Sequence, residues 1–401
     1  MHPSNAPEQA AVSPSSRTSL LGANPAQRIA FTLAMLALYL LARLIPAAGI
    51  NPDFSFATDG ANPQLAYDLS PTLSYVALGV TPLFSVLLLA EVFKLAFSDV
   101  RSWAVESRRT RYLLNKALVV AALMLAAFQA YGLSVGLDAL QTSYGAQETL
   151  PILEPGLQFR ASYILGVVTG TALAIWVADQ ITRHGNGSGF WMLFLLPSLI
   201  ALAMMPATWL VHLANGLLSA PALGALLIVM VASAAAITAL TRQWIALAPS
   251  AAEFDQASDM ARIMLWPPFI ASSIAALLAA LMTFVSGVDG GLWLLRGSLA
   301  WSISIAVLIP FLTYAMANGM LDLTTRNAPQ TRRLLAMTVV AATATCVAID
   351  VIATHVAPLA ISGPIWIAML TVFALLLPSN ASAYLTKQAP AAELDDNNGT
   401  A

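Results

Sequence analysis

Long apolar segments alternate with short polar ones along most of this chain. Most of the apolar segments are close to the length of about 20 residues that an α-helix needs to cross a bilayer. Ten of them can be recognised, at residues 28–48, 73–97, 114–136, 161–182, 190–212, 218–240, 263–286, 293–318, 332–354 and 360–383. The pattern therefore predicts an all-α polytopic membrane protein with ten transmembrane helices.

Polar segments flank this apolar region at both ends. Residues 1–25 are rich in Ser, Pro, Ala and Asn, and they lack the order of regions that marks a signal peptide. They predict a disordered cytosolic tail, and the polar, acidic residues 386–401 predict a second one. Between the tails, we assign residues 26–213 to an N-terminal half of five helices and residues 214–385 to a C-terminal half of five helices.

Composition supports the membrane assignment and excludes some other classes. Of the 401 residues, 58% are hydrophobic and 9% are charged, whereas soluble domains carry about 25% charged residues. The formal net charge of -2 gives no support for a nucleic-acid partner. The single cysteine, Cys346, lies in an apolar segment and is predicted to be a small buried residue, because it has no partner for an intramolecular disulfide.

The basic residues indicate the orientation in the membrane. If the N-terminus is cytosolic, fifteen Lys and Arg residues fall on the cytosolic side and only Arg43, Arg160 and Arg296 on the other. The two long outer segments, 49–72 and 137–160, are acidic. Because positive residues are retained on the cytosolic side, and because ten helices is an even number, both termini are predicted to be cytoplasmic.

A glycine-rich elbow separates the fourth apolar segment from the fifth. Residues 179–189 read Asp-Gln-Ile-Thr-Arg-His-Gly-Asn-Gly-Ser-Gly. Alternating glycines allow a chain to reverse within few residues, so a tight cytosolic turn is predicted. A nucleotide-binding loop is disfavoured, because the segment before it does not read as a soluble strand. The candidate elbow residues are Asp179, Gln180, Arg183, Gly185, Gly187 and Gly189.

The two halves have similar residue patterns at their second helices. Residues 79–85 and 266–273 each place proline near a predicted helix start, followed by an aromatic and then small residues. An offset of five helices makes equivalent helices antiparallel, which is the inverted-repeat pattern in which interrupted helices mark a transport pathway. Proline at a helix start is also ordinary capping chemistry, so both interpretations stay open.

Few ionisable residues fall within the apolar segments. Glu91 and Asp179 are placed near cytosolic ends, where water reaches them. Asp350 and His355, near the outer end of the ninth segment, are predicted to lie at a hydrated helix end rather than to form a proton relay. No carboxylate stands near mid-membrane, where a proton-coupled carrier would need one. No metal-ligand spacing or catalytic motif is present, so no metal, cofactor or enzymatic activity is predicted.

With the helices placed, the sequence resembles the SecY family of protein-conducting channels at several points in the right order. The resemblance covers residues 26–320 in motifs, and it extends to residue 383 by helix count. The segments that carry it are residues 44–51 (Leu-Ile-Pro-Ala-Ala-Gly-Ile-Asn), 77–82 (Ala-Leu-Gly-Val-Thr-Pro), 127–132 (Ala-Phe-Gln-Ala-Tyr-Gly), the elbow, and 267–274 (Pro-Pro-Phe-Ile-Ala-Ser-Ser-Ile).

This resemblance implies two inverted five-helix halves around an hourglass pore that opens sideways between the second and seventh helices. An apolar ring seals the waist by excluding water, and a plug follows the first helix. The implied ring residues are Val80, Phe84, Phe194, Ser198, Phe269 and Met369. The implied lateral-gate residues are Pro82, Ser85, Pro267, Ser272 and Ser273. The alternative for these aromatics is a place in the core or against lipid.

The sequence also departs from the family pattern. The cytosolic loops at 242–261 and 319–331 are short, although the family's are long and basic and dock the ribosome or the SecA motor. The plug region, 52–72, lacks the family's glycine-rich segment. Ribosome or SecA docking is therefore expected to be weak.

These features predict a divergent SecY-like channel in a bacterial inner membrane. It would pass polypeptides across the membrane or release them into it, with a specialised substrate. The implied partners are membrane lipid, the translocating polypeptide and a small SecE-like membrane helix. Two alternatives remain: a small-solute secondary transporter, which a mid-membrane charge pair would favour, and a non-conducting membrane scaffold, which a pore too aromatic to open would favour.

Overall fold

The structure of the protein is a computed structural model. It describes residues 25–51, 73–97, 99–100, 103, 108–144, 152–247, 254–292, 296, 298–321, 328–355 and 361–376. The predicted plug segment 52–72 and the predicted tails, apart from Pro25, lie outside the described residues.

The described part of the chain is all-α, as predicted, and its element order contains ten α-helices. Eight of them are long and apolar enough to cross a membrane, and the other two, α4 and α14, are shorter. The helices are α1 (Pro25–Arg43), α4 (Thr81–Ala96), α6 (Arg108–Tyr144), α7 (Leu157–His184), α8 (Gly189–Ala214), α9 (Ala220–Ala246), α10 (Phe254–Leu292), α11 (Leu299–Met320), α13 (Pro329–His355) and α14 (Gly363–Leu376).

Helix α4 is short because the first part of its predicted segment is not helical. Residues 73–80 form turns and one bridge, and Gly79 has a φ of 51°, a backbone conformation that favours glycine. Helix α4 then begins at Thr81 with Pro82 in its first turn, where proline costs no hydrogen bond. With 16 residues, α4 is about 24 Å long at 1.5 Å per residue, which is shorter than the hydrocarbon core of a bilayer, about 30 Å thick.

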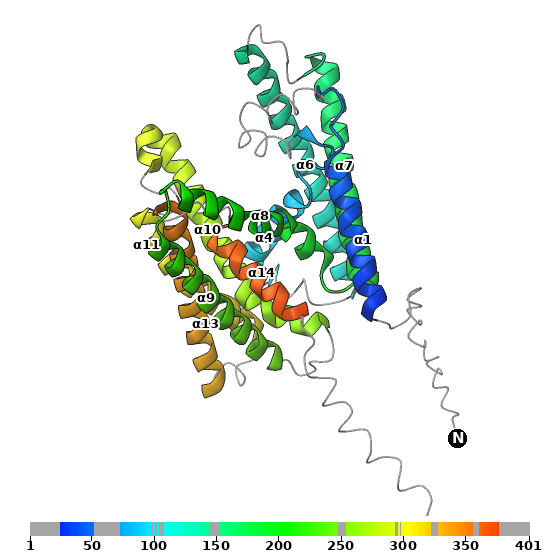
Figure 1. The fold of residues 1–401 in the computed structure, drawn as a ribbon. Coiled ribbons are helices and arrows are strands. Elements are labelled where there is room, and N and C mark those ends of the chain that lie inside the picture. Colours follow the sequence, from blue (N-terminus) through cyan, green and yellow to red (C-terminus); the bar gives the residue numbers. More distant parts are fainter. Residues whose placement is uncertain are drawn as a thin grey trace, which may run out of the picture.

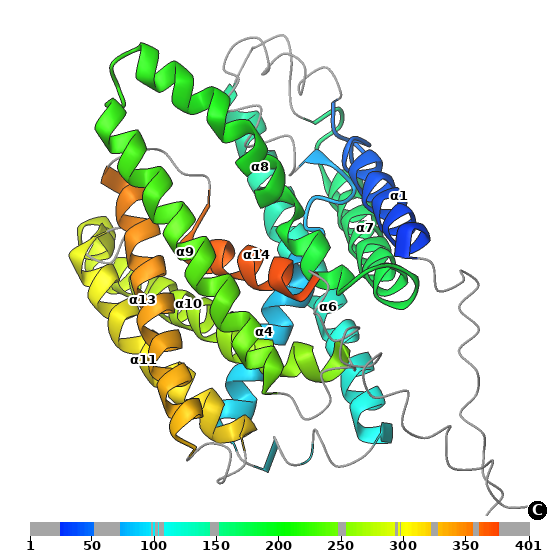
Figure 2. The same cartoon turned by 60° about the horizontal axis from the view of Figure 1, so that its bottom comes forward.

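The helices form two groups with three helices between them (Figures 1 and 2). Helices α1, α6 and α7 pack together on one side, and α9, α10, α11 and α13 pack together on the other. Helices α4, α8 and α14 lie between the groups: α4 contacts α6 and α10, while α8 contacts α7 and α14. The boundary between residues 213 and 214, and the inverted relation of the halves, stay predictions.

Helix α8 contributes to two separate hydrophobic cores. Leu193 and Leu196 pack in a core with residues of α1 and α7. Trp191 and Leu195 pack in the largest core, which is otherwise built by α9 to α14. Helix α8 is therefore apolar around its circumference, as expected for a helix buried between two partners.

The segments that follow α1, precede α4 and precede α7 are joined by backbone hydrogen bonding. Isolated β-bridges join Pro46 to Ser74 and Ile50 to Ile152, and the backbone N–H of Ala47 donates to the carbonyl of Leu73 at 2.7 Å. These segments all belong to the side that the basic residues mark as outer. The described residues on either side of segment 52–72 are thus paired with neighbouring segments, Leu73 with Ala47 and Ile50 with Ile152.

The elbow between α7 and α8 is a turn of four residues, 185–188. Gly187 has a φ of 84°, which only glycine adopts readily. Gly185 and Gly189 sit so close to the Thr32 hydroxyl and the Ala178 carbonyl that an added Cβ would overlap them. Each glycine is therefore required for its own reason: Gly185 and Gly189 allow a close approach of the backbone to neighbouring atoms, and Gly187 adopts a positive φ.

Hydrogen bonds hold the elbow in place, and polar residues precede it. The backbone N–H of Asn186 donates to Oγ1 of Thr32 in α1 at 2.9 Å, which ties the elbow to the first helix. Arg183 and Asp179 form an exposed ion pair of 2.9 Å within α7, next to Gln180, which is half-buried. The elbow is thus fixed on a neighbouring helix.

Two sequence-based boundaries around α10 are wrong. The region 242–261 was predicted as a loop, but α9 continues to Ala246 and α10 already begins at Phe254. Pro267 and Pro268 therefore lie inside α10 rather than at its start. The polar residues before them continue the helix beyond the apolar segment, so the parallel with Pro82, which does lie at a helix start, does not hold.

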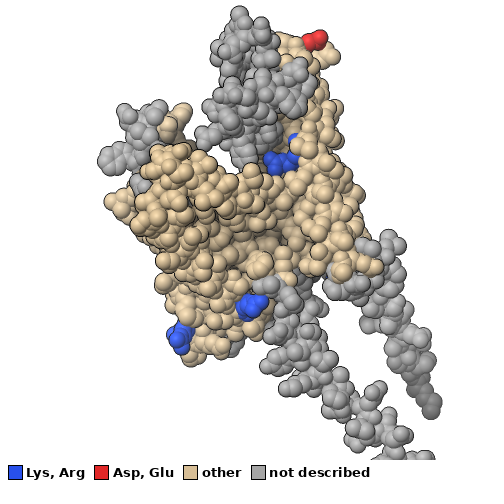
Figure 3. Space-filling model, viewed as in Figure 1, with Lys and Arg blue, Asp and Glu red and all other residues tan. Residues whose placement is uncertain are grey.

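One wide face of the molecule carries few charges (Figure 3). Large apolar side chains are exposed on several helices, among them Phe128 of α6, Leu165 of α7 and Phe311 of α11, which are 74%, 70% and 68% exposed. Soluble proteins rarely expose such continuous apolar surface, so this surface fits a lipid environment.

The orientation in the membrane can be tested with reporter fusions. Fusions at Gly60 and Ala146 are expected to report the outer side, and those at Arg108 and Ala328 the cytosolic side, because of the distribution of basic residues. The measurement is paired activity of a periplasmic and a cytoplasmic reporter at each site. A cytoplasmic signal at Gly60 would overturn the proposed orientation.

Candidate pore waist and gate

Three of the predicted ring residues meet where α4, α8 and α10 come together. The rings of Phe84 and Phe194 are stacked with their centroids 4.3 Å apart. Phe269 meets Phe84 edge to face at 5.0 Å, and it lies 5.8 Å from Phe194. Residues separated by up to 185 positions in the sequence therefore form one contact.

Three further aromatic residues complete this group, and the sequence-based set omitted them. Trp191 lies 5.6 Å from Trp266 and 5.2 Å from Phe190, and Trp266 lies 6.0 Å from Phe84. A signal was present for the α8 residues, because positions 190, 191 and 194 recur at the spacing of one helix face. We call the six residues the aromatic cluster: Phe84, Phe190, Trp191, Phe194, Trp266 and Phe269.

The aromatic cluster closes the space between the helices with stacked and edge-to-face contacts. Such pairs contribute about 0.5–1.5 kcal/mol each beyond the burial of their area. Trp266 and Phe269 are 5% and 7% exposed, so water does not reach most of their surface. The arrangement can exclude water and ions from a neck between the helices.

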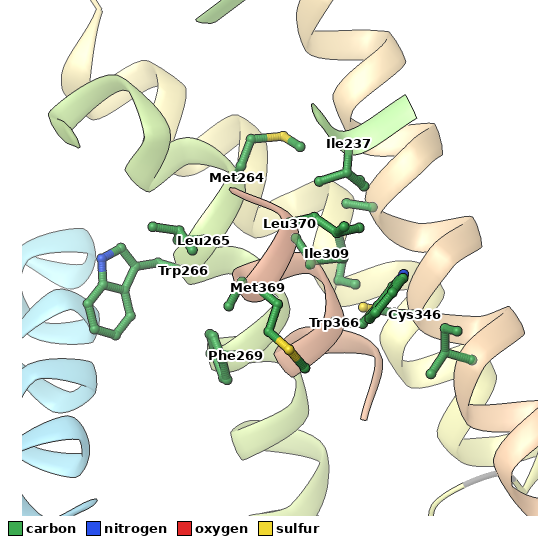
Figure 4. Packing of buried hydrophobic residues seen from close by; sticks show 14 of the residues in the cluster. Ile237, Met264, Leu265, Trp266, Phe269, Ile309, Cys346, Trp366, Met369 and Leu370 are labelled. Carbon is green, nitrogen blue, oxygen red and sulfur yellow. The ribbon is translucent and has the colours of Figure 1, made fainter. Parts of the chain in front are cut away.

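The remaining ring residues lie around the cluster at different distances. Met369 of α14 belongs to the same core as Phe269 and appears beside it in Figure 4. Val80 is buried one turn before Phe84 but packs in the core on the α1 and α7 side. Val80 and Phe194 also line one small cavity. Ser198 is half-buried one turn after Phe194.

The predicted gate residues fall on α4 and α10, which contact each other. Pro82 is buried at the start of α4, and the Ser85 hydroxyl donates to the Thr81 carbonyl at 3.2 Å. Pro267 is buried within α10. Ser272 is half-buried, with its hydroxyl oxygen enclosed and without a hydrogen-bond partner, and the following Ser273 is exposed.

An ion pair joins the same two helices beyond the cluster. Glu91 of α4 is 6% exposed, and its carboxylate accepts from Arg262 of α10 and, at 3.0 Å, from Lys94 of its own helix. The prediction that Glu91 lies at a water-exposed helix end is wrong in this respect: Arg262 and Lys94 supply the partners that water was expected to supply. We call the contact of α4 with α10 the seam.

Asp350 is likewise not at a hydrated helix end, because it is 1% exposed. One carboxylate oxygen accepts from Arg296 Nε at 3.0 Å and from the Gly363 backbone N–H at 3.2 Å. The other accepts from Trp301 Nε1 at 3.0 Å. Arg296 also donates to the Ile361 carbonyl at 2.8 Å. Asp350 therefore anchors the start of α14, and its role in this structure is to accept these hydrogen bonds.

The site is built from apolar and aromatic side chains. In the part of the chain that the structure describes, no group of three or more His, Cys, Asp or Glu residues is arranged to hold a metal ion. Cys346 is buried, as predicted, with its backbone packed against Gly363. The arrangement that the fold does provide is a bundle whose helices close on an apolar, aromatic waist.

These features define a polytopic helical membrane protein whose helices α4, α8 and α10 meet at the aromatic cluster, and comparison with known proteins identifies its family. The SecY family model matches residues 74–387. The chain belongs to the SecY family.

Individual relatives are similar over part of the chain. The SecY protein translocase subunit of Aquifex aeolicus is 32% identical over 174 residues, which are 41% of this chain and 39% of that protein. The corresponding subunit of Thermus thermophilus is 28% identical over 192 residues, 46% of this chain and 42% of that protein. These alignments thus span about two fifths of the relatives' length.

Solved structures show the same fold over nearly the whole chain. A structure of SecY described for its plug domain and closed state aligns with 92% of this chain and 95% of its own, at a TM-score of 0.53 and 12% identity. Sec61 from a canine ribosome-channel complex aligns with the same coverage and TM-score at 10% identity. The SecY fold implied by the sequence motifs is thereby confirmed.

Proposed function

We propose that this protein is a polypeptide-conducting channel whose resting state is closed at the aromatic cluster. The observation that carries the proposal is the meeting of Phe84, Phe194 and Phe269, three side chains from three helices, at one apolar contact. Membership of the SecY family supports a translocation role. The channel would pass a polypeptide across the bacterial inner membrane or release it sideways through the seam.

The segment 52–72 is the proposed plug. Its described neighbours, Asn51 and Leu73, lie at the outer ends of the N-terminal helices, where Ala47 is hydrogen-bonded to Leu73. We propose that this segment plugs the channel on the outer side of the waist. Opening would require both displacement of this loop and separation of the aromatic rings.

The carrier alternative is not favoured by the buried carboxylates that the structure describes. Among the described residues, the buried carboxylates are Glu91 and Asp350, and each is paired with an arginine. A proton-coupled carrier needs a carboxylate that can change its charge during transport. In this structure both carboxylates make ion pairs that join neighbouring segments of the fold.

Crosslinking from the waist tests the proposed function. A photoreactive amino acid at Phe84 is expected to capture a passing polypeptide in cells, because the waist surrounds the substrate during transport. The same residue at Phe128, which is 74% exposed on α6, is expected to capture lipid. Absence of polypeptide adducts at Phe84, with lipid adducts at Phe128, would favour a non-conducting scaffold.

Partners of the channel can be identified by their co-purification with the protein. We propose membrane lipid and a small SecE-like helix as partners. We also propose that docking of the ribosome or SecA is weak, because the segments 242–261 and 319–331, parts of which are helical, lack a basic run. Ribosomes or SecA that co-purify in stoichiometric amounts at moderate salt would contradict the docking proposal.

A further inference from the structure

The seam contains two contacts of different chemistry on one face of α4. Phe84 contacts Trp266 and Phe269 of α10, and Glu91, seven residues further along α4, is paired with Arg262 of α10. Residues seven apart lie on the same side of a helix. An apolar contact and an ionic contact are therefore stacked along the seam.

The ionic contact depends on the closed arrangement of α4 and α10. The Glu91 side chain is 8% exposed and that of Arg262 is 31% exposed, so the carboxylate is largely screened from water. If α10 moves away from α4, Glu91 loses the cross-helix partner. A contact made in one conformation and absent from another shifts the equilibrium between them.

Lys94 has a different relation to Glu91. It lies three residues further along the same helix, at 3.0 Å, with its side chain 23% exposed. Its ion pair moves with α4 and persists whichever way α10 moves. Lys94 therefore compensates the carboxylate when the cross-helix partner leaves, so that opening does not leave a buried charge without a partner.

We propose that Glu91 and Arg262 form an electrostatic latch that holds the seam closed, with Lys94 stabilising the released carboxylate. The inference rests on the proposed function, because it assigns a regulatory role to the gate of that channel. The aromatic cluster seals the waist against water, whereas the latch sets how often the seam separates.

The test measures separation of the seam directly. In a Cys346→Ala background, spin labels are placed at Leu89 of α4 and Ser273 of α10, which are both exposed. The distance distribution between the labels is recorded in lipid nanodiscs. Glu91→Gln is expected to raise the separated population about tenfold, within the usual range of coupling between states. Arg262→Gln, which breaks the pair from the other side, is expected to do the same.

A charge-mirrored variant separates electrostatics from packing. Glu91→Lys, Lys94→Glu and Arg262→Glu together reverse the charges of these three residues and keep the attraction of position 91 for positions 94 and 262, so the parent distribution is expected to return. Asp179→Asn is the matched control, since its pair lies within α7 and is exposed, and no shift is expected. An unchanged distribution in both single variants, or no recovery in the mirrored one, would overturn the latch.

The readout also keeps the latch distinct from the channel. The label distances require neither current nor substrate, so they report on the seam even if the protein conducts nothing. If the label distances respond to the latch variants but no polypeptide adducts form at Phe84, the latch is supported and the channel function is contradicted. If adducts form at Phe84 but the label distances do not respond, the channel function is supported and the latch is contradicted.

Discussion

Replacing Phe84 and Phe269 together with serine is expected to make the resting protein leak ions. The centroids of the two rings are 5.0 Å apart. Both rings also contact Phe194, and in addition Phe84 contacts Trp266 and Phe269 contacts Trp191. Removing them opens the middle of the aromatic cluster, and the hydroxyl groups favour water in the space that is left. Because an apolar neck excludes ions only while it stays dry, conductance in planar bilayers is expected to exceed that of the parent.

The size order of the leak is part of this prediction. Each single variant leaves one ring to fill part of the gap, so the double variant is expected to leak more than the two single variants. Truncating a buried Phe costs about 3–5 kcal/mol, so folding is checked by size-exclusion chromatography and circular dichroism. A well-folded double variant that stays as tight as the parent would show that these rings do not line a pore.

The control for this leak has to be chosen from the structure. Phe31 is unsuitable, because its ring packs edge to face on His184 at 5.7 Å. Phe128 and Phe311 are better, since they are 74% and 68% exposed. Serine at either position is expected to leave the resting conductance unchanged.

Asp350→Ala is expected to lower the free energy of unfolding by about 3–5 kcal/mol, as for other buried ion pairs broken on one side. The substitution leaves Arg296, the Trp301 indole N–H and the Gly363 backbone N–H without their common acceptor. Since Gly363 begins α14, the start of that helix loses its attachment to α13. Denaturant unfolding in detergent, followed by tryptophan fluorescence, measures the effect.

An exposed pair gives the matched comparison. Asp179→Ala removes the partner of Arg183, but the two side chains are 44% and 66% exposed. Exposed pairs contribute about 1 kcal/mol or less, so a much smaller change is expected. Equal changes for Asp350→Ala and Asp179→Ala would contradict the assignment of Asp350 as an anchor.

The apolar pattern was sufficient for the fold because the bilayer restricts it. A segment of about 20 apolar residues in lipid has to satisfy its backbone internally, so helices were placed correctly without tertiary information. The boundaries failed where polar residues continue a helix, as at Phe254, and where a membrane-length segment is partly irregular, as before Thr81. Apolar periodicity carries no signal for either case.

The waist was predicted in part. Phe84, Phe194 and Phe269 were placed by resemblance, and the structure brings them together. The spacing of positions 190, 191 and 194 on one face of α8 carried a signal for Trp191, whereas nothing in the sequence distinguishes Trp266 from other apolar aromatics on a buried helix. The partners of Glu91 and Asp350 were also missed, since each is paired with an arginine more than 50 positions away. Such contacts are decided by tertiary packing.

Helix α8 constrains how this sequence can change over time. Leu193 and Leu196 serve one core and Trp191 and Leu195 the other, so a substitution on α8 has to suit two sets of neighbours at once. Most single changes there will disturb one of them, and compensating changes will have to arise on α7 or α14. We therefore expect the sequence of α8 to differ less among close homologues than that of α6, because the wide lipid-facing surface of α6 requires only that its side chains be apolar.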